Sequence, residues 1–336
     1  MLKKSCIYIF LALCLLLSSC AESKKVESGG FDPLKAEEIE TFQNDENTEK
    51  YIEKRIAELS AKWDAGKSES EIAKLNNTRE SAPLSEDTKK LLLDCISLSE
   101  KTDGFFDVTL YPLIRLWGFD TDEPKIPQEM LVSLMASKCG MDTISFVESN
   151  FVLDQFTMIN VNAVVNGNSA DVIASELEKE GTKEALIKIG SHVRTLGNKK
   201  DGKKWNVALT DPFKEDQIFS YVSVDGGLSV STRGTYQNYF EEDGKRYCDV
   251  FDPRNGGPID NDLVSVTVIC ESGITADAFA NASLVMGSKD AAKFYRDNGN
   301  FEIIMVMNDG SVKASEGIAD ALVFSTADQD VEVIKK

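Results

Sequence analysis

The chain has 336 residues and carries 56 Asp and Glu side chains against 37 Lys and Arg, so its formal net charge at pH 7 is −19. This acidity argues against a nucleic acid as the partner, because a polyanion would be repelled. A zinc site of His and Cys ligands is also disfavoured, since the sequence holds a single histidine, His192, and no CxxC pair.

The first residues, MLKKSCIYIFLALCLLLSSC, have the pattern of a bacterial export signal. Two lysines precede an apolar run that is too short to span a membrane comfortably, and small residues stand directly before Cys20. We therefore expect residues 1–20 to be a lipoprotein signal sequence, with Cys20 lipidated as the membrane anchor of the mature protein. The alternatives are a plain cleaved signal and a short anchor helix. In each case the protein is expected to be exported, on the periplasmic or cell-surface side.

Residues 21–48 are polar and acidic with scattered glycine, which indicates a flexible tether. Residues 49–336 are numerous enough for one large domain, or two closely packed ones, with a substantial core. Two cysteines of this region, Cys248 and Cys270, lie on neighbouring strand-like segments. One disulfide between them is compatible with an exported protein, although a domain of this size does not need one.

The globular region begins with helical patterns. Apolar residues recur at helical spacing in residues 51–63, residues 68–77 suggest a short helix, and Ser85 opens a longer periodic segment that ends at Gly104. Further helices are indicated at residues 169–184, 276–288 and 289–299. Strand patterns lie at residues 204–211, 219–224, 228–232, 265–270 and 301–307. Helices followed by strands interleaved with a few helices predict an α+β fold with mixed or antiparallel sheets.

Common nucleotide-binding signatures are missing from the sequence. No GxGxxG follows a strand pattern and no GxxxxGK[ST] occurs, so neither a Rossmann nor a P-loop site is supported. Two other stretches combine groups suited to a ligand. TDGFFDVTLYPLIRLWGF, residues 102–119, could form a wall for a flat aromatic ligand with Asp107 as a hydrogen-bond acceptor, although core packing explains its aromatics equally well. NVNAVVNGNSAD, residues 160–171, places Asn and Gly before a helix, where free N–H groups can bind phosphate or an ordinary cap can form.

Two later stretches carry polar groups at suggestive spacing. Asp277 and Asn281 are four residues apart in ITADAFANAS, hence on one helical face, where their oxygens could share a hard cation such as Mg²⁺. YCDVFDPRNGGP, residues 247–258, brings several groups able to touch a ligand to one turn, although Asp-Pro and Asn-Gly-Gly are also ordinary turn chemistry.

Taken in order, these stretches resemble the FAD:protein FMN transferases. The likeness covers roughly residues 50–300 and includes the segments SESEIAKLN, GFFDVTLYPLIRLWGF, INVNAVVNGNSADVIA, the W-x-V-x-x-x-D-P stretch of Trp205 to Pro212, the YCDVFDPRNGGP loop and the ITADAFANAS helix. The resemblance implies a flavin transferase (T-fold-like) architecture. It also implies an exported enzyme that uses Mg²⁺ to break the pyrophosphate of FAD, releases AMP, and moves FMN onto a threonine hydroxyl of a partner protein. The partner implied by the family is a membrane redox complex of the sodium-pumping NADH:quinone oxidoreductase type.

The resemblance further implies roles for individual residues. Catalytic roles fall on Asp249, Asp252 and Arg233. Metal binding falls on the backbone carbonyl of Ala163 and on the side chains of Asp277 and Asn281. Contacts with the flavin nucleotide fall on Trp63, Phe105, Phe106, Asp107, Asn160, Asn166, Gly167 and Phe251.

Several matched positions depart from the family pattern. Asn160 stands where the family usually has Asp, Asn166 where it has Lys or Gln, and Asn281 where it has the metal-binding Thr. Asp249 replaces the loop histidine, which places a negative charge where a pyrophosphate should lie. Arg233 replaces the serine of a Ser-Gly turn and can pair with phosphate. These changes keep a second hypothesis open, namely a catalytically degenerate member that binds flavin or a protein partner without turnover.

Overall fold

The computed structural model describes residues 46–80, 84–148, 150–199, 202–325 and 329–336. The signal sequence expected at residues 1–20 and the tether expected at residues 21–48 lie outside these ranges, apart from residues 46–48, which begin the first helix. No helix within the described ranges combines the length and apolar content needed to cross a membrane.

Short helices form the first part of the fold, and those expected from hydrophobic spacing are present. They are α1 (Glu46–Trp63), α2 (Glu71–Thr78) and α3 (Glu86–Lys101), followed by α4 (Tyr111–Leu116), α5 (Glu129–Ala136) and a 3-10 turn (Met141–Thr143). Ser70 caps the start of α2, because its hydroxyl accepts a hydrogen bond from the N–H of Ala73. A hairpin of β1 (Ile144–Val147) and β2 (Asn150–Leu153) closes this part.

A seven-stranded sheet forms the centre of the molecule, in the order β16-β14-β13-β12-β7-β4-β3. Its strands are β3 (Ala185–Ile189), β4 (His192–Leu196), β7 (Ser229–Gly234), β12 (Leu263–Cys270), β13 (Glu302–Met307), β14 (Val312–Ser315) and β16 (Val331–Ile334). Neighbouring strands are antiparallel except β14 and β16, which are parallel. Every residue of β12 is buried, which accounts for its unbroken apolar and small-residue sequence.

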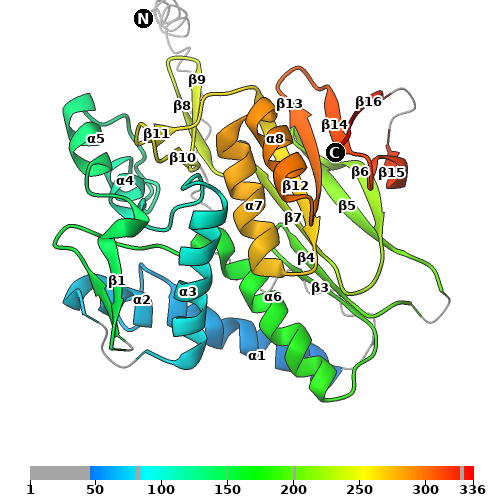
Figure 1. Cartoon of the computed structure of the whole chain (residues 1–336), viewed down its shortest axis with the longest axis horizontal. Coiled ribbons are helices and arrows are strands. Elements are labelled where there is room, and N and C mark those ends of the chain that lie inside the picture. Colours follow the sequence, from blue (N-terminus) through cyan, green and yellow to red (C-terminus); the bar gives the residue numbers. More distant parts are fainter. Residues whose placement is uncertain (1–45, 81–83, 149, 200–201, 326–328) are drawn as a thin grey trace, which may run out of the picture.

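Three helices cover one face of this sheet: α6 (Asn162–Lys179), α7 (Gly273–Met286) and α8 (Ser288–Asn298). Figure 1 shows α7 and α8 lying across the sheet, with α6 beside α7. Helices α6 and α7 approach closely because glycines face each other; a Cβ built on Gly167 would lie 2.2 Å from the carbonyl oxygen of Gly273. The large core between helices and sheet includes Val164, Val268 and Phe279.

The opposite face of the central sheet packs on a second sheet. This sheet has the order β15-β6-β5 and contains β5 (Trp205–Asp211), β6 (Lys214–Val224) and β15 (Leu322–Phe324), preceded by a 3-10 turn (Ala319–Ala321). A second core, with Trp205, Val222 and Ile304 among its members, fills the space between the sheets. Two further hairpins pair β8 (Tyr239–Glu242) with β9 (Lys245–Cys248), and β10 (Phe251–Asp252) with β11 (Gly257–Pro258).

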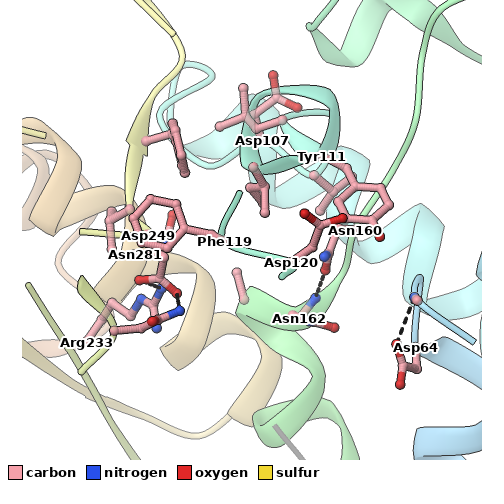
Figure 2. Close-up of a pocket in the computed structure, with 18 of the residues that line it drawn as sticks. Asp64, Asp107, Tyr111, Phe119, Asp120, Asn160, Asn162, Arg233, Asp249 and Asn281 are labelled. Atoms are coloured by element: carbon pink, nitrogen blue, oxygen red, sulfur yellow. Dashed lines mark hydrogen bonds and ion pairs between the residues drawn. The ribbon is translucent and has the colours of Figure 1, made fainter. Parts of the chain in front are cut away.

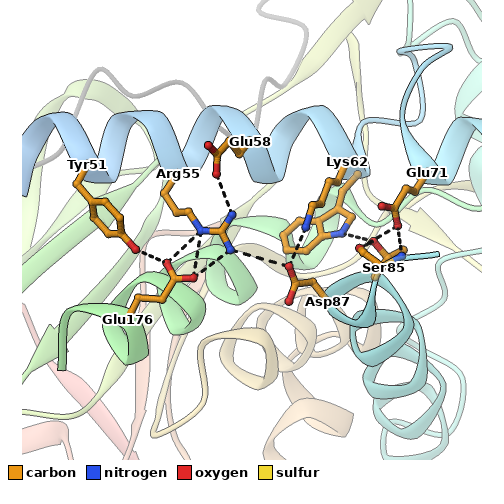
Figure 3. A network of polar contacts seen from close by, with 10 residues as sticks. Tyr51, Arg55, Glu58, Lys62, Glu71, Ser85, Asp87 and Glu176 are labelled. Atoms are coloured by element: carbon orange, nitrogen blue, oxygen red, sulfur yellow. Dashed lines mark hydrogen bonds and ion pairs between the residues drawn. The ribbon is translucent and has the colours of Figure 1, made fainter. Parts of the chain in front are cut away.

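Polar contacts fix α1 against its neighbours (Figure 3). Glu176 of α6 accepts hydrogen bonds from the Tyr51 hydroxyl at 2.8 Å and from Arg55 at 3.0 and 3.1 Å. Lys62 pairs with Asp87 of α3 at 2.8 Å. The burial of Tyr51 beside the Glu176 carboxylate raises the pKa of its hydroxyl to about 12. The network anchors α1 to α3 and α6. The first residues of α6 line the site described below.

Two details differ from the sequence-based expectations. Helix α6 begins at Asn162 and not near residue 169, so Asn166 and Gly167 lie inside the helix and not before it. Burial of Val164 and Val165 and the close contact with Gly273 outweigh the poor helix propensity of Asn and Gly. The four cysteines of the described residues are all free thiols, so the disulfide considered for Cys248 and Cys270 is not formed.

Candidate active site

A cavity of about 290 Å³ opens where several distant segments meet (Figure 2). One wall is the segment that contains α4, and the opposite wall is formed by residues 249–251, which lead from β9 into the start of β10. Asn160, Asn162 and Ala163 contribute the start of α6, Arg233 the end of β7, and Asn281 the middle of α7. The cavity therefore lies where the helical first part of the fold meets the central sheet.

Two polar side chains of the cavity are held by short-range hydrogen bonds. Asp107 accepts from the backbone N–H of Thr109 at 2.7 Å and from its hydroxyl at 2.6 Å. Asn160 accepts from the N–H of Asn162 at 2.8 Å, which caps the first turn of α6. The backbone N–H of Asn160 donates to the carbonyl of Val108 at 2.8 Å, so the two segments are fixed side by side. Burial raises the pKa of Asp107, and the bonds from Thr109 reduce that rise.

An ion pair crosses the inner end of the cavity. Arg233 Nη2 donates to Asp249 Oδ1 at 2.7 Å, and both side chains are almost buried, with exposed fractions of 13% and 11%. Asn238 Nδ2 donates to the other oxygen of Asp249 at 3.3 Å. Asn281 lies beside this pair (Figure 2). Arg233 and Asp249, the two most conspicuous departures from the family pattern, thus contact each other.

Aspartate dominates the charge of the cavity. Among the described residues that line it, Arg233 is the one cationic side chain, whereas five carboxylates share the lining: Asp64, Asp107, Asp120, Asp122 and Asp249. An anionic ligand group therefore finds its favourable partner at Arg233, because a guanidinium can bind phosphate through two parallel hydrogen bonds.

Aromatic side chains form the outer wall. Phe119 and Phe251 line the cavity with their rings edge to face at 5.8 Å between centroids. Behind them Trp117 and Phe240 complete a separate apolar cluster. These rings give the cavity an apolar lining of the kind that suits a heteroaromatic ligand.

The cavity brings together seven of the residues proposed from the sequence. They are Asp107, Asn160, Ala163, Arg233, Asp249, Phe251 and Asn281. Sequence reasoning did not assign Tyr111, Phe119, Asp120, Asn162 and Asn238, which also line it. The first two fall inside the aromatic stretch at residues 102–119, so weighting every aromatic of that stretch could have found them.

Two of the proposed flavin-contact residues lie in the core and not in the cavity. The Trp63 side chain is fully buried, and its indole N–H donates to the Thr88 hydroxyl at 3.0 Å. Phe106 is also buried in the core. The guanidinium of Arg254 lies over the ring of Phe105, with its central carbon 4.8 Å from the ring centroid. The structure therefore places none of these three side chains on the cavity wall.

The remaining proposed residues perform local structural roles. Asn166 is buried against the turn at Gly190, and Gly167 forms the contact between α6 and α7. Asp252 accepts three hydrogen bonds from the Arg254 side chain, at 2.7, 2.8 and 3.1 Å, and one from its backbone N–H at 2.9 Å. These bonds stabilise the turn after β10. Asp252 is thus a turn-forming residue beside the cavity.

The residues implied for Mg²⁺ do not fit a metal site in this arrangement. Ala163 and Asn281 line the cavity, but Asp277 does not, and its carboxylate is occupied on both oxygens. Oδ1 accepts from His192 Nδ1 at 2.7 Å and from the Ser231 hydroxyl at 2.6 Å, while Oδ2 accepts from the N–H of Gly167 at 2.6 Å. Across the described residues no group of three or more His, Cys, Asp and Glu side chains is placed to hold a metal ion. We therefore derive no catalytic step through a metal.

Comparisons with known proteins agree with the motif order. A sequence model of the ApbE family matches residues 27–305. The FAD:protein FMN transferase of Salmonella typhimurium LT2 is 30% identical over 277 residues, which cover 76% of this chain and 79% of the relative. That of Escherichia coli K12 is 30% identical over 256 residues, covering 73% and 72%. Among solved structures, the ApbE protein of Thermotoga maritima is similar with a TM-score of 0.76 at 26% identity, covering 82% of this chain and 90% of that one. The flavin transferase ApbE of Vibrio cholerae has a TM-score of 0.71 at 26% identity, covering 83% and 90%. The α+β fold predicted from the sequence is confirmed.

Proposed function

The chain belongs to the ApbE family, and from this membership we propose that it is an FAD:protein FMN transferase, which moves FMN from FAD to a threonine hydroxyl of an exported or membrane redox protein and releases AMP. In this reaction the threonine oxygen forms a bond to the phosphorus of the FMN half. The bond from that phosphorus to the bridging oxygen breaks, AMP leaves with the electron pair, and the hydroxyl proton passes to a base.

One observation carries the proposal. Five residues from separate parts of the chain, all at positions that the family resemblance assigns, converge on one cavity: Asp107, Asn160, Arg233, Asp249 and Asn281. The aromatic wall at Phe119 and Phe251 suits the isoalloxazine ring, and Arg233 suits a phosphate. Asp249 holds the guanidinium at 2.7 Å, and we propose it as the base that accepts the threonine proton.

The proposal includes a location. The export signal and Cys20 support a lipoprotein held at a membrane through its lipid, with the cavity on the periplasmic or cell-surface side. An acceptor subunit of a membrane redox complex would then lie on the same side as the enzyme. The Mg²⁺ that the resemblance implies is left out of this proposal because Asp277 presents no free carboxylate.

The test uses the protein purified in detergent, incubated with FAD and a threonine-bearing acceptor protein. We expect AMP to appear in the solution and flavin fluorescence to become covalently attached to the acceptor, in equal amounts. A matched reaction with the acceptor threonine replaced by valine should release no AMP by transfer. Binding of FAD without AMP or labelled acceptor, at any divalent ion concentration, contradicts the proposal.

A second candidate function is a flavin-binding protein without turnover. It is favoured by the acidic cavity and by Asp249 in place of the loop histidine, because a carboxylate repels the pyrophosphate. In that case, restoring the family residues in contact should create activity: Asp249→His with Arg233→Ser and Asn281→Thr. Turnover by the unaltered chain eliminates this candidate.

A further inference from the structure

We infer that His192 keeps Asp277 from binding divalent cations, so that this chain holds no metal ion at the position where the family resemblance implies one. The inference rests on the proposed function in one respect: the family resemblance is what assigns metal binding to Asp277. Its physical basis is the hydrogen bonding of one buried carboxylate.

Protein donors occupy the Asp277 carboxylate from two sides. His192 Nδ1 and the Ser231 hydroxyl donate to Oδ1 at 2.7 and 2.6 Å, and the N–H of Gly167 donates to Oδ2 at 2.6 Å. The three side chains are more than nine-tenths buried, with exposed fractions of 6% for Asp277, 1% for His192 and 4% for Ser231. Hydrogen bonds to a charged group are the strong ones, and in a buried position water cannot replace them.

The sheet register fixes the two side-chain donors. His192 on β4 is directly opposite Ser231 on β7, so both side chains point to the same face of the sheet, toward α7. The other imidazole nitrogen, Nε2, lies 3.2 Å from the hydroxyl of Ser229, two residues before Ser231 on the same strand and face. The imidazole is therefore held at both nitrogens, and its orientation toward Asp277 is determined by the fold.

The third donor prevents the carboxylate from turning away. A Cβ built on Gly167 would lie 2.7 Å from Asp277 Oδ2, which shows how closely this oxygen lies on the backbone of α6. To reach an ion in the cavity, the carboxylate would have to leave His192, Ser231 and Gly167 together. Their donors would then remain buried without a partner, which is costly.

The other implied ligands cannot compensate for this loss. The Ala163 carbonyl and the Asn281 amide are neutral, and Mg²⁺ normally requires at least one carboxylate in near-ideal octahedral geometry. Asp249, a carboxylate that lines the same cavity, is paired with Arg233 at 2.7 Å. A cation placed there would lie against the guanidinium.

The test measures Mn²⁺ binding to the full chain in detergent by the EPR signal of free Mn²⁺, without FAD. We expect the unaltered protein and Asp277→Asn to bind Mn²⁺ equally. His192→Gly removes one donor and opens space beside Asp277, so it should bind Mn²⁺ at least tenfold more tightly than the unaltered protein, and His192→Gly/Asp277→Asn should lose that gain. Ser229→Ala is the matched control, because it contacts His192 but not Asp277 and should leave Mn²⁺ binding unchanged.

Two results overturn the inference: Mn²⁺ binding by the unaltered protein that disappears in Asp277→Asn, or a folded His192→Gly variant that gains no binding. If His192→Gly does not fold, His192→Ala, which also lacks a donor, replaces it and is judged by the same criterion. Because FAD is absent, failure of FMN transfer leaves this result intact, and a metal site at Asp277 would leave the transferase proposal intact.

Discussion

Replacing Arg233 by methionine tests the assignment of the phosphate-binding group. Methionine keeps most of the side-chain volume but removes the one cation among the described residues of the cavity wall. Charge-assisted hydrogen bonds contribute about 1.5–3 kcal/mol, and about 1.4 kcal/mol corresponds to tenfold in affinity, so we expect FAD binding to weaken roughly 10- to 150-fold. Titration of flavin fluorescence measures this directly.

The same substitution should also lower stability, because it leaves Asp249 almost buried without its cation. Breaking a buried pair costs about 3–5 kcal/mol, and since both side chains retain some exposure we expect a cost at or just below that range, about 2–3 kcal/mol. Arg233→Met/Asp249→Asn removes the unpaired charge and should regain part of this stability but none of the FAD affinity. The control is Arg254→Met. It also removes an arginine from an Arg–Asp pair, that of Arg254 with Asp252, but the Arg254 side chain is 57% exposed. Normal FAD affinity in Arg233→Met would refute the assignment.

Three further predictions concern packing, stacking and pH. Gly167→Ala would place a Cβ 2.2 Å from the Gly273 carbonyl oxygen, so it should lower the free energy of unfolding by about 1–3 kcal/mol in chemical denaturation. The control Gly257→Ala, whose Cβ would have its nearest neighbour at 3.4 Å, should have little effect. Equal stabilities of the two variants would contradict the close α6–α7 contact. Trp63→Phe should leave FAD affinity unchanged because the indole is buried and bonded to Thr88, and a marked loss would restore the stacking role implied by the resemblance. Burial raises the pKa of Asp107 above its usual 3.8, so the folded state holds the proton more tightly than the unfolded state does. The free energy of unfolding therefore falls as the pH rises from 3.8 through the higher pKa of the folded state. Asp107→Asn should therefore stabilise the protein at pH 7, with a gain that shrinks toward pH 3.8 in urea unfolding curves; a gain independent of pH would show that the charge of Asp107 is not its cause.

Periodicity predicted those elements whose cause is local. Helix α1 and helix α3 present apolar residues every three or four positions, and that signal requires no knowledge of the partner surface. The start of α6 was misjudged for the opposite reason. Asn166 and Gly167 have poor helix propensity. The helix runs through them because Val164 and Val165 are buried and because Gly167 contacts Gly273, more than a hundred residues away in sequence. The strand order of the central sheet likewise depends on pairings that no local pattern contains.

The sequence predicted site residues correctly where adjacent backbone groups hold the side chain. It failed where the side chain forms a hydrogen bond to a partner elsewhere in the core. Asp107 and Asn160 line the cavity because adjacent backbone N–H groups hold them. Trp63 and Asp277 stand at matching positions in the sequence, but Thr88 and His192 offer them partners elsewhere. A family alignment assigns a position, whereas the direction of a polar side chain is decided by the nearest buried donor or acceptor.

Two departures from the family pattern, Asp249 and Arg233, contact each other, and this changes how they should be judged. Taken singly, Asp249 is a misplaced negative charge and Arg233 a misplaced positive one; together they form a 2.7 Å pair that satisfies both. His192 likewise contacts Asp277, a residue that matches the family pattern, at 2.7 Å. A single reversion such as Asp249→His would leave Arg233 beside another potential cation, so its failure would say nothing about the ancestral chemistry. Because residues in contact couple energetically, each pair must be exchanged as a unit before its effect on flavin binding or transfer can be interpreted.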